Sequence, residues 1–109
     1  MKKTQEEINA IELDIIENIL SYVMDPEIEI DIVNLGLIYE LDYDGDKGVH
    51  ILMTMSTPAC PLSDAIVQNV KESIKAKYPD FEVNVQLTFD PPWNTDMITP
   101  EGREMLGMQ

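Results

Sequence analysis

Cysteine, histidine and basic residues are scarce in this 109-residue chain, and each shortage excludes a class of function. A single cysteine cannot form a disulfide within the chain, and a single histidine cannot supply the histidine pair of a common zinc motif. The sequence also lacks a glycine-rich loop of the kind that binds phosphate groups. We therefore expect neither disulfide exchange within one chain nor a zinc centre built on paired histidines.

Charge narrows the choice of partners further. The chain has seven lysine and arginine residues but 21 aspartate and glutamate residues, which gives a formal net charge of -14. Such a surface repels nucleic-acid backbones and anionic membranes. No apolar run approaches the ~20 residues that span a bilayer, and the first residues lack the apolar core of a signal peptide. We expect a cytoplasmic protein with no nucleic-acid or membrane partner.

The apolar pattern first predicts a helix. Thr4 and Glu7 have the spacing of a capping box, and isoleucines then recur at helical spacing from Ile8. Pro26 disfavours helical backbone at the residue before it, so we expect this helix to stop near Met24. Residues 25–27 are predicted to be a connector, and residues 1–109 are predicted to form one domain.

Alternating apolar residues then predict strands. Residues 33–43 and 49–55 alternate on either side of a glycine-containing turn, which indicates an antiparallel hairpin. Pro61 is suited to the first turn of a helix that ends near Tyr78, and residues 81–89 alternate as a third strand. A short helix over residues 100–106 follows. The expected fold is α+β with two layers, in the order helix-strand-strand-helix-strand-helix, with helices covering one face of a three-stranded sheet.

The expected strand directions bring four separated segments to one end of the sheet. The start of the first strand lies beside the end of the second, and a helical crossover returns the third strand in the same direction as the second. We therefore predict that one rim gathers the polar and aromatic residues that interrupt the regular pattern: Asp25, Glu27, Asn34, Thr57, Cys60 and Trp93.

Cys60 is the most reactive of these candidates. At the start of a helix, free backbone N–H groups favour a thiolate, which is the form that binds metal. The helix dipole contributes only ~0.3–1 kcal/mol, so a small buried apolar role is also consistent with the pattern. Asp25 and Glu27 fit either ligands or acid-base groups, or else solvated turn residues. Trp93 fits either a binding surface or a plug at the sheet end. His50 has no spaced partner, so we assign it no role.

Four ordered motifs resemble the domain of unknown function 59 family, which includes SufT-type and PaaD-type proteins. They are Asp-Pro-Glu-Ile at residues 25–28, Ile-Val-Asn-Leu-Gly-Leu-Ile-Tyr at 32–39, Thr-Pro-Ala-Cys-Pro-Leu at 57–62 and Pro-Pro-Trp at 91–93. The family more often has aspartate where this chain has Asn34. PaaD-type members carry a further cysteine-rich segment, and this chain ends at Gln109, which favours the SufT-like branch.

The resemblance implies an accessory, non-catalytic role in iron-sulfur cluster assembly or delivery. Cys60 occupies the family's cysteine position and would be the metal ligand or transfer residue, with Asp25, Glu27, Asn34, Thr57 and Trp93 as binding residues. The cargo would be a transiently held iron-sulfur cluster or iron. The partners would be the iron-sulfur assembly machinery and client apoproteins. One thiolate is too few for a cluster that takes four ligands, so a carrier or adaptor is expected.

Other interpretations remain at this stage. The alternative is a metal-free adaptor, similar to the PaaD-type oxygenase accessories, that docks a client enzyme. An RNA-binding domain of the KH type has a similar element order, but the charge and the missing Gly-x-x-Gly loop argue against it. We also expect a homodimer or weak self-association through adaptable apolar side chains near the C-terminus, namely Met97, Ile98, Met105, Leu106 and Met108.

Overall fold

The computed structural model describes residues 3–25, 28–56 and 63–107. Helix α1 (Gln5–Asn18) begins at the predicted capping box. The Thr4 hydroxyl accepts a hydrogen bond from the backbone N–H of Glu7 at 3.2 Å, and the Glu7 carboxylate accepts one from the backbone N–H of Thr4 at 3.3 Å. This part of the prediction is confirmed, because a capping box depends only on residues three positions apart.

Helical structure continues beyond α1 as a short 3₁₀ helix, η1 (Leu20–Tyr22). It ends two residues before Met24. The segment predicted to be a plain connector instead contributes strand β1 (Met24–Asp25), which pairs antiparallel with β2 (Ile30–Asp31). Two-residue strands are too short for a periodic signal, which is why the sequence pattern did not indicate them.

The main sheet has the predicted topology. Strands β3 (Ile38–Tyr43) and β4 (Gly48–Met53) form an antiparallel hairpin, and helix α2 (Ser63–Lys77) crosses over to β5 (Glu82–Leu87), which runs parallel to β4. The strand order is β3-β4-β5. After β5 come a 3₁₀ helix, η2 (Thr95–Met97), and helix α3 (Pro100–Met105). The predicted α+β class is confirmed.

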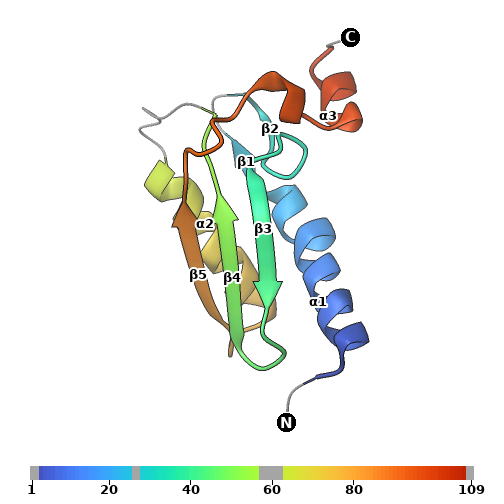
Figure 1. The fold of residues 1–109 in the computed structure, drawn as a ribbon, viewed down its shortest axis with the longest axis vertical. Coiled ribbons are helices and arrows are strands. Elements are labelled where there is room, and N and C mark those ends of the chain that lie inside the picture. Colours follow the sequence, from blue (N-terminus) through green and yellow to red (C-terminus); the bar gives the residue numbers. More distant parts are fainter. Residues whose placement is uncertain (1–2, 26–27, 57–62, 108–109) are drawn as a thin grey trace.

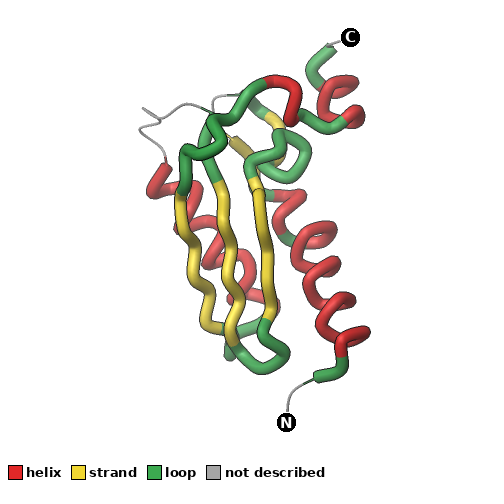
Figure 2. Tube along the Cα trace, in the orientation of Figure 1, coloured by secondary structure: helices red, strands yellow, loops and turns green. Residues whose placement is uncertain are grey.

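Helices and sheet form two layers (Figures 1 and 2). Helix α2 crosses behind the sheet, and α1 lies alongside β3. The Glu12 carboxylate accepts a hydrogen bond of 2.9 Å from the backbone N–H of Tyr43, so α1 also covers part of the edge of β3. The core between the layers consists mainly of aliphatic side chains, including Ile15, Leu20, Ile51, Met53, Ile66, Val70, Ile74 and Val83.

The start of the first long strand was predicted wrongly. Residues 32–36 form a turn, and β3 begins only at Ile38. Leu35 and Leu37 are fully buried as the alternation required, but Leu35 reaches the core from the turn and Leu37 from the residue between the turn and β3. The pairing of β3 with β4 is irregular between Ile38 and Glu40, which changes again which side chains of β3 point toward the core. The Tyr39 hydroxyl consequently bonds to the carbonyl of Pro91 instead of joining the apolar face.

The C-terminal segment packs largely on its own chain. Ile98 is only 5% exposed and belongs to the core, and Leu106 packs against that core. These two residues are therefore not available for the self-association surface that we expected. Met105 is 65% exposed, whereas Met108 lies outside the described residues. Among the described residues, no helix is long and apolar enough to cross a membrane.

A polar contact fastens α1 to the end of α2. The Tyr78 hydroxyl donates a 2.5 Å hydrogen bond to the Asp14 carboxylate, and Lys77 forms an ion pair with the same group at 2.9 Å. The ring of Tyr78 stacks on Phe81 with centroids 4.5 Å apart. The hydrogen bond from Tyr78, together with those from Asn18 and Lys77, lowers the pKa of Asp14 to about 2. Burial, and then the Asp14 contact, raises the pKa of Tyr78 to about 12.

We predict that Tyr78→Phe removes the largest cause of the low Asp14 pKa while keeping the ring stack. A depressed carboxylate pKa stabilises the fold above the ordinary value of 3.8, and this contribution is lost as pH falls toward 2. The variant should therefore lose less stability across this acid range, and its Asp14 carboxyl should titrate closer to the ordinary value.

NMR titration of the Asp14 carboxyl and urea unfolding at several acid pH values provide the measurement. Asn18→Ala is the matched control, because it removes a smaller contribution to the same carboxylate. An unchanged Asp14 titration in Tyr78→Phe would contradict the assignment.

Candidate functional site

One end of the main sheet collects most of the predicted site segments. The start of β3 and the ends of β4 and β5 lie there, together with the β1–β2 pair and the start of α2, at the upper end in Figure 1. Asn34 and Trp93 both contact this end through hydrogen bonds. The structure thus brings together residues that are far apart in the sequence, as the strand directions predicted.

Asp31 organises the turn that leads into β3. Its carboxylate accepts a hydrogen bond from the backbone N–H of Asn34 at 2.9 Å and another from the Asn34 side-chain amide at 2.8 Å. The Asp31 residue is only 5% exposed. Our sequence interpretation missed this residue, although an aspartate directly before a turn, with its carboxylate available to the N–H three residues later, is a recognisable capping signal.

Asn34 links this turn to the C-terminal segment. Its side-chain oxygen accepts a 2.6 Å hydrogen bond from the Thr99 hydroxyl, and its backbone carbonyl accepts one from the Thr99 N–H at 2.9 Å. The Thr99 hydroxyl in turn accepts from the backbone N–H of Gly102 at 3.0 Å, which caps α3. An amide can donate to Asp31 and accept from Thr99, whereas an ionised carboxylate cannot donate. This pairing explains why asparagine suits position 34 in this chain.

Trp93 joins the segment after β5 to the same turn. Its indole N–H donates a 2.7 Å hydrogen bond to the carbonyl oxygen of Leu35, and its ring packs against the core while remaining partly exposed. The packing agrees with the plug that we considered for Trp93, and the binding surface stays a prediction. The side chain closes the sheet end, and it leaves some surface accessible.

Asp25 is buried, with only 1% of its surface exposed, so the solvated-turn interpretation was wrong for this residue. It is engaged in contacts within the protein. Glu27, Thr57 and Cys60 lie outside the described residues. We refer to residues 57–62, which contain Cys60, as the cysteine segment. Its described neighbours are Ser56, which follows β4, and Ser63, which begins α2.

A backbone hydrogen bond joins the chain just after β4 to Leu37, which lies between the turn of residues 32–36 and β3. The N–H of Thr54 donates a 2.8 Å hydrogen bond to the carbonyl of Leu37, and both Thr54 and Met55 are buried. The chain that enters the cysteine segment therefore leaves from the same fixed end of the sheet that holds Asn34 and Trp93. Within residues 3–25, 28–56 and 63–107, no cluster of three or more histidine, cysteine or acidic residues could hold a metal ion.

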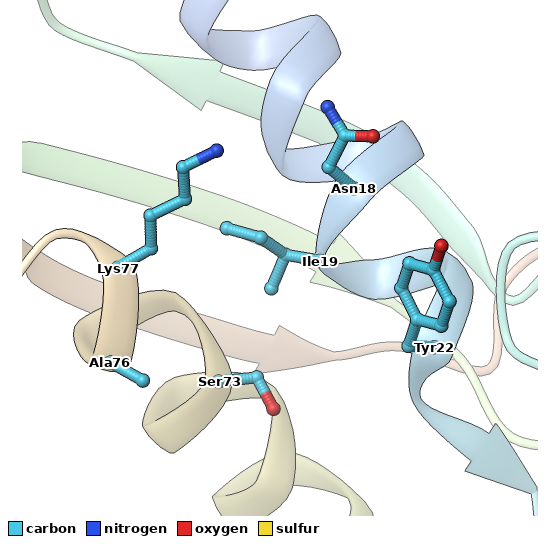
Figure 3. Close-up of a pocket in the computed structure, with 6 residues that line it drawn as sticks. All are labelled: Asn18, Ile19, Tyr22, Ser73, Ala76 and Lys77. Carbon is cyan, nitrogen blue, oxygen red and sulfur yellow. The ribbon is translucent and has the colours of Figure 1, made fainter.

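Two hollows lie away from this end. One of about 520 Å³ lies between the end of α1, η1 and α2, where Ile19 lies between Lys77 and Tyr22 (Figure 3). The other, of about 210 Å³, lies near the β3–β4 turn and is lined in part by His50. Neither contains a residue that the sequence motifs indicated as functional.

These observations define a small α+β domain with one structurally fixed end, from which the chain enters the segment that contains its single cysteine. Residues 13–87 match the family described as iron-sulfur cluster assembly protein, and the chain belongs to that family.

Relatives agree with this assignment in sequence and in structure. The Fe-S protein maturation auxiliary factor YitW of Bacillus subtilis is 41% identical over 91 residues, covering 83% of this chain and 88% of that protein. SufT of Staphylococcus aureus, another Fe-S protein maturation auxiliary factor, is 36% identical over 79% of this chain and 98% of its own length. A crystal structure of a domain of unknown function from Bacillus anthracis has a TM-score of 0.89 at 33% identity, covering 97% of this chain and 100% of that chain.

The expected likeness to PaaD-type proteins is also present. A component of the putative 1,2-phenylacetyl-CoA epoxidase of Escherichia coli is 33% identical over 81% of this chain, but the match covers only 53% of that protein. The maturation factors, by contrast, are covered over 88% and 98% of their length.

We predict that Asn34→Asp destabilises the fold by about 1–3 kcal/mol near neutral pH. The new carboxylate would face Asp31 without a proton to donate, and two neighbouring carboxylates repel each other. Protonation near pH 4 should recover part of the loss, because a carboxyl group can then donate. Urea unfolding at pH 4 and pH 7 measures the difference. Asn34→Ala adds no charge and should show no such recovery, so equal pH dependence in both variants would contradict this account.

Gly36 generates a second prediction. Its φ is +78°, and an added Cβ would lie 2.2 Å from the backbone oxygen of Met97. Gly107 has a similar φ of +72° but nothing within 4 Å of an added Cβ. Gly107→Ala should therefore cost only the ~1–2 kcal/mol of left-handed backbone strain, and Gly36→Ala should cost clearly more. Denaturant unfolding of the two variants tests this, and similar losses would exclude the close approach as a constraint.

Proposed function

We propose that this chain is an accessory factor that helps iron-sulfur clusters reach client apoproteins, with the Cys60 thiolate as the ligand that holds or transfers the cargo. The cargo is an iron-sulfur cluster or iron. The observation that carries the proposal is the position of the cysteine segment. In sequence it joins β4 to α2, and β4 ends at the end of the sheet where Trp93 bonds to Leu35, next to Asn34, in a chain that belongs to the iron-sulfur cluster assembly family.

The chemistry of thiolate supports this role. Thiolate sulfur is a soft ligand that binds iron and iron-sulfur clusters, whereas hydroxyl groups remain protonated at neutral pH and bind iron weakly. Cys60 is the single cysteine of the sequence, so the chain offers one thiolate where a cluster takes four ligands. The remaining ligands would come from the assembly machinery, a client or a small thiol. Shared ligation favours transfer over storage.

The described residues around the cysteine segment support a positioning function. The hydrogen bonds among Asp31, Asn34 and Thr99 fix the turn before β3, and Trp93 holds the segment after β5 against it. Because this end of the sheet is held in place, a thiolate attached next to it samples fewer positions before it meets a partner protein. We propose that Asn34 and Trp93 hold this end of the sheet in place and do not themselves bind the cargo. Asp25, Glu27 and Thr57 remain our proposed binding residues beside Cys60, and we place the function in the cytoplasm.

We predict that Cys60→Ser removes support of cluster-dependent enzymes and leaves the domain folded. Serine is nearly the same size as cysteine, so the packing change is small and only the soft ligand is lost. The activity of a cluster-dependent enzyme in cells that carry only the variant, under iron limitation, measures the loss. Thermal unfolding of the purified variant measures the fold.

Anaerobic reconstitution with iron, sulfide and a small thiol, which can supply the remaining ligands, provides the control. Absorbance of a bound cluster should appear in the native protein and be absent in Cys60→Ser. The double variant Cys60→Ser with Ser63→Cys restores a thiol three residues away, and it should not restore activity if the position of the thiolate matters. A folded Cys60→Ser protein with full client activity would refute the thiolate role and favour the metal-free adaptor.

A further inference from the structure

The face of the sheet opposite the helices is open and acidic. It faces the viewer in Figure 1, with α2 behind it. The three strands contain no lysine or arginine, and their exposed residues include Glu40 and Asp42 on β3 and Glu82 on β5. A surface of this kind attracts basic groups and repels acidic ones.

A pocket of about 650 Å³ lies on this face near the fixed end of the sheet. Ile38 and Leu52 line it from the hairpin, and Pro91 and Met97 line it from the segment after β5. Its size falls within the ~300–1,000 Å³ typical of binding pockets, and its apolar walls include these four side chains. The pocket is therefore large enough for one aliphatic side chain of a partner.

The pocket walls are held in place without a ligand. The Tyr39 hydroxyl donates a 2.7 Å hydrogen bond to the carbonyl of Pro91, and it also lies 3.6 Å from the sulfur of Met97. Gly36 contacts the Met97 backbone so closely that no side chain fits between them. A pocket with fixed walls loses little entropy on binding.

Carboxylates complete the pocket. Glu40 and Asp90 are exposed and line it, and no basic residue is among the described residues that do so. Two basic residues of the described ranges have partners elsewhere: Arg103 donates to the carbonyl of Thr95, and Lys77 pairs with Asp14. An aliphatic pocket with two carboxylates is complementary to an aliphatic side chain between two cationic ones.

We propose that this pocket docks a segment of a client protein that presents one aliphatic side chain flanked by lysine or arginine. The proposal rests on the proposed function, because it supposes that clients bind this chain. The aliphatic side chain enters between Leu52 and Met97, and the flanking cations lie against Glu40 and Asp90. The pocket shares Gly36 and the Asp90–Met97 segment with the fixed end of the sheet, so a docked client lies near the point where the chain enters the cysteine segment.

The test uses two synthetic peptides with the full-length protein. One contains Lys-Leu-Lys between glycines, and the other contains Glu-Leu-Glu in the same frame. NMR titration should show that the basic peptide shifts the amide signals of Gly36, Leu52 and Met97 and that the acidic peptide does not. Glu40→Lys should weaken binding of the basic peptide by about tenfold or more, and added salt should weaken it in the native protein.

Glu17→Lys is the matched control, because it makes the same charge change on α1, away from this pocket. It should leave the peptide affinity within about twofold of the native value, because exposed charges beyond a Debye length are largely screened. Glu40→Gln provides a milder variant should Glu40→Lys fail to fold. Shifts that map to another surface, or equal weakening by Glu17→Lys and Glu40→Lys, would overturn the proposal.

Cys60→Ser separates this inference from the proposed function. It should bind the basic peptide as the native protein does, while failing to support client enzymes. Client support that survives in Cys60→Ser refutes the thiolate role alone. Absence of peptide binding at millimolar concentration refutes the docking pocket alone.

Discussion

The hydrogen bond from the Thr99 hydroxyl to the side-chain oxygen of Asn34 joins the turn before β3 to the C-terminal segment that begins α3. Asn34 passes the constraint on by donating to Asp31, and Thr99 passes it on by accepting from the N–H of Gly102. Donation runs one way along this chain of hydrogen bonds, from Gly102 to Thr99, then to Asn34 and finally to Asp31. Partly buried polar groups that are all paired in this way specify a single arrangement, because any alternative leaves one of them unsatisfied.

This arrangement places two different surfaces side by side. The Asp31–Asn34 turn and Trp93 form the end of the sheet from which the chain enters the cysteine segment, and Gly36 leads from that turn to the pocket on the open face. In our proposals, one surface holds iron-sulfur cargo and the other holds a client. Transfer between two proteins is faster when their reacting groups are held close together and need little reorganisation. A common support for both surfaces meets that requirement.

Several elements could be predicted from the sequence because their causes are local. Thr4 and Glu7 cap α1 across three residues, and the turn between β3 and β4 sits between two alternating strands. The crossover through α2 follows from one helix between two strands, which leaves β5 parallel to β4. These strand directions were enough to predict that Asn34 and Trp93 meet at one end, although they could not predict the atoms that join them.

The sequence by itself determined the order of the longer helices and strands, the helix cap, the acidic surface and the position of the one thiol in the chain. The tertiary structure decided where β3 begins, that Asp25 is buried, and that Asn34 is a connector. The reason is the range of the forces involved. Capping and amphipathic periodicity act over a few residues, whereas Asn34 bonds to a partner 65 positions away and the Trp93 indole to one 58 positions away. Such contacts exist only after the chain has folded.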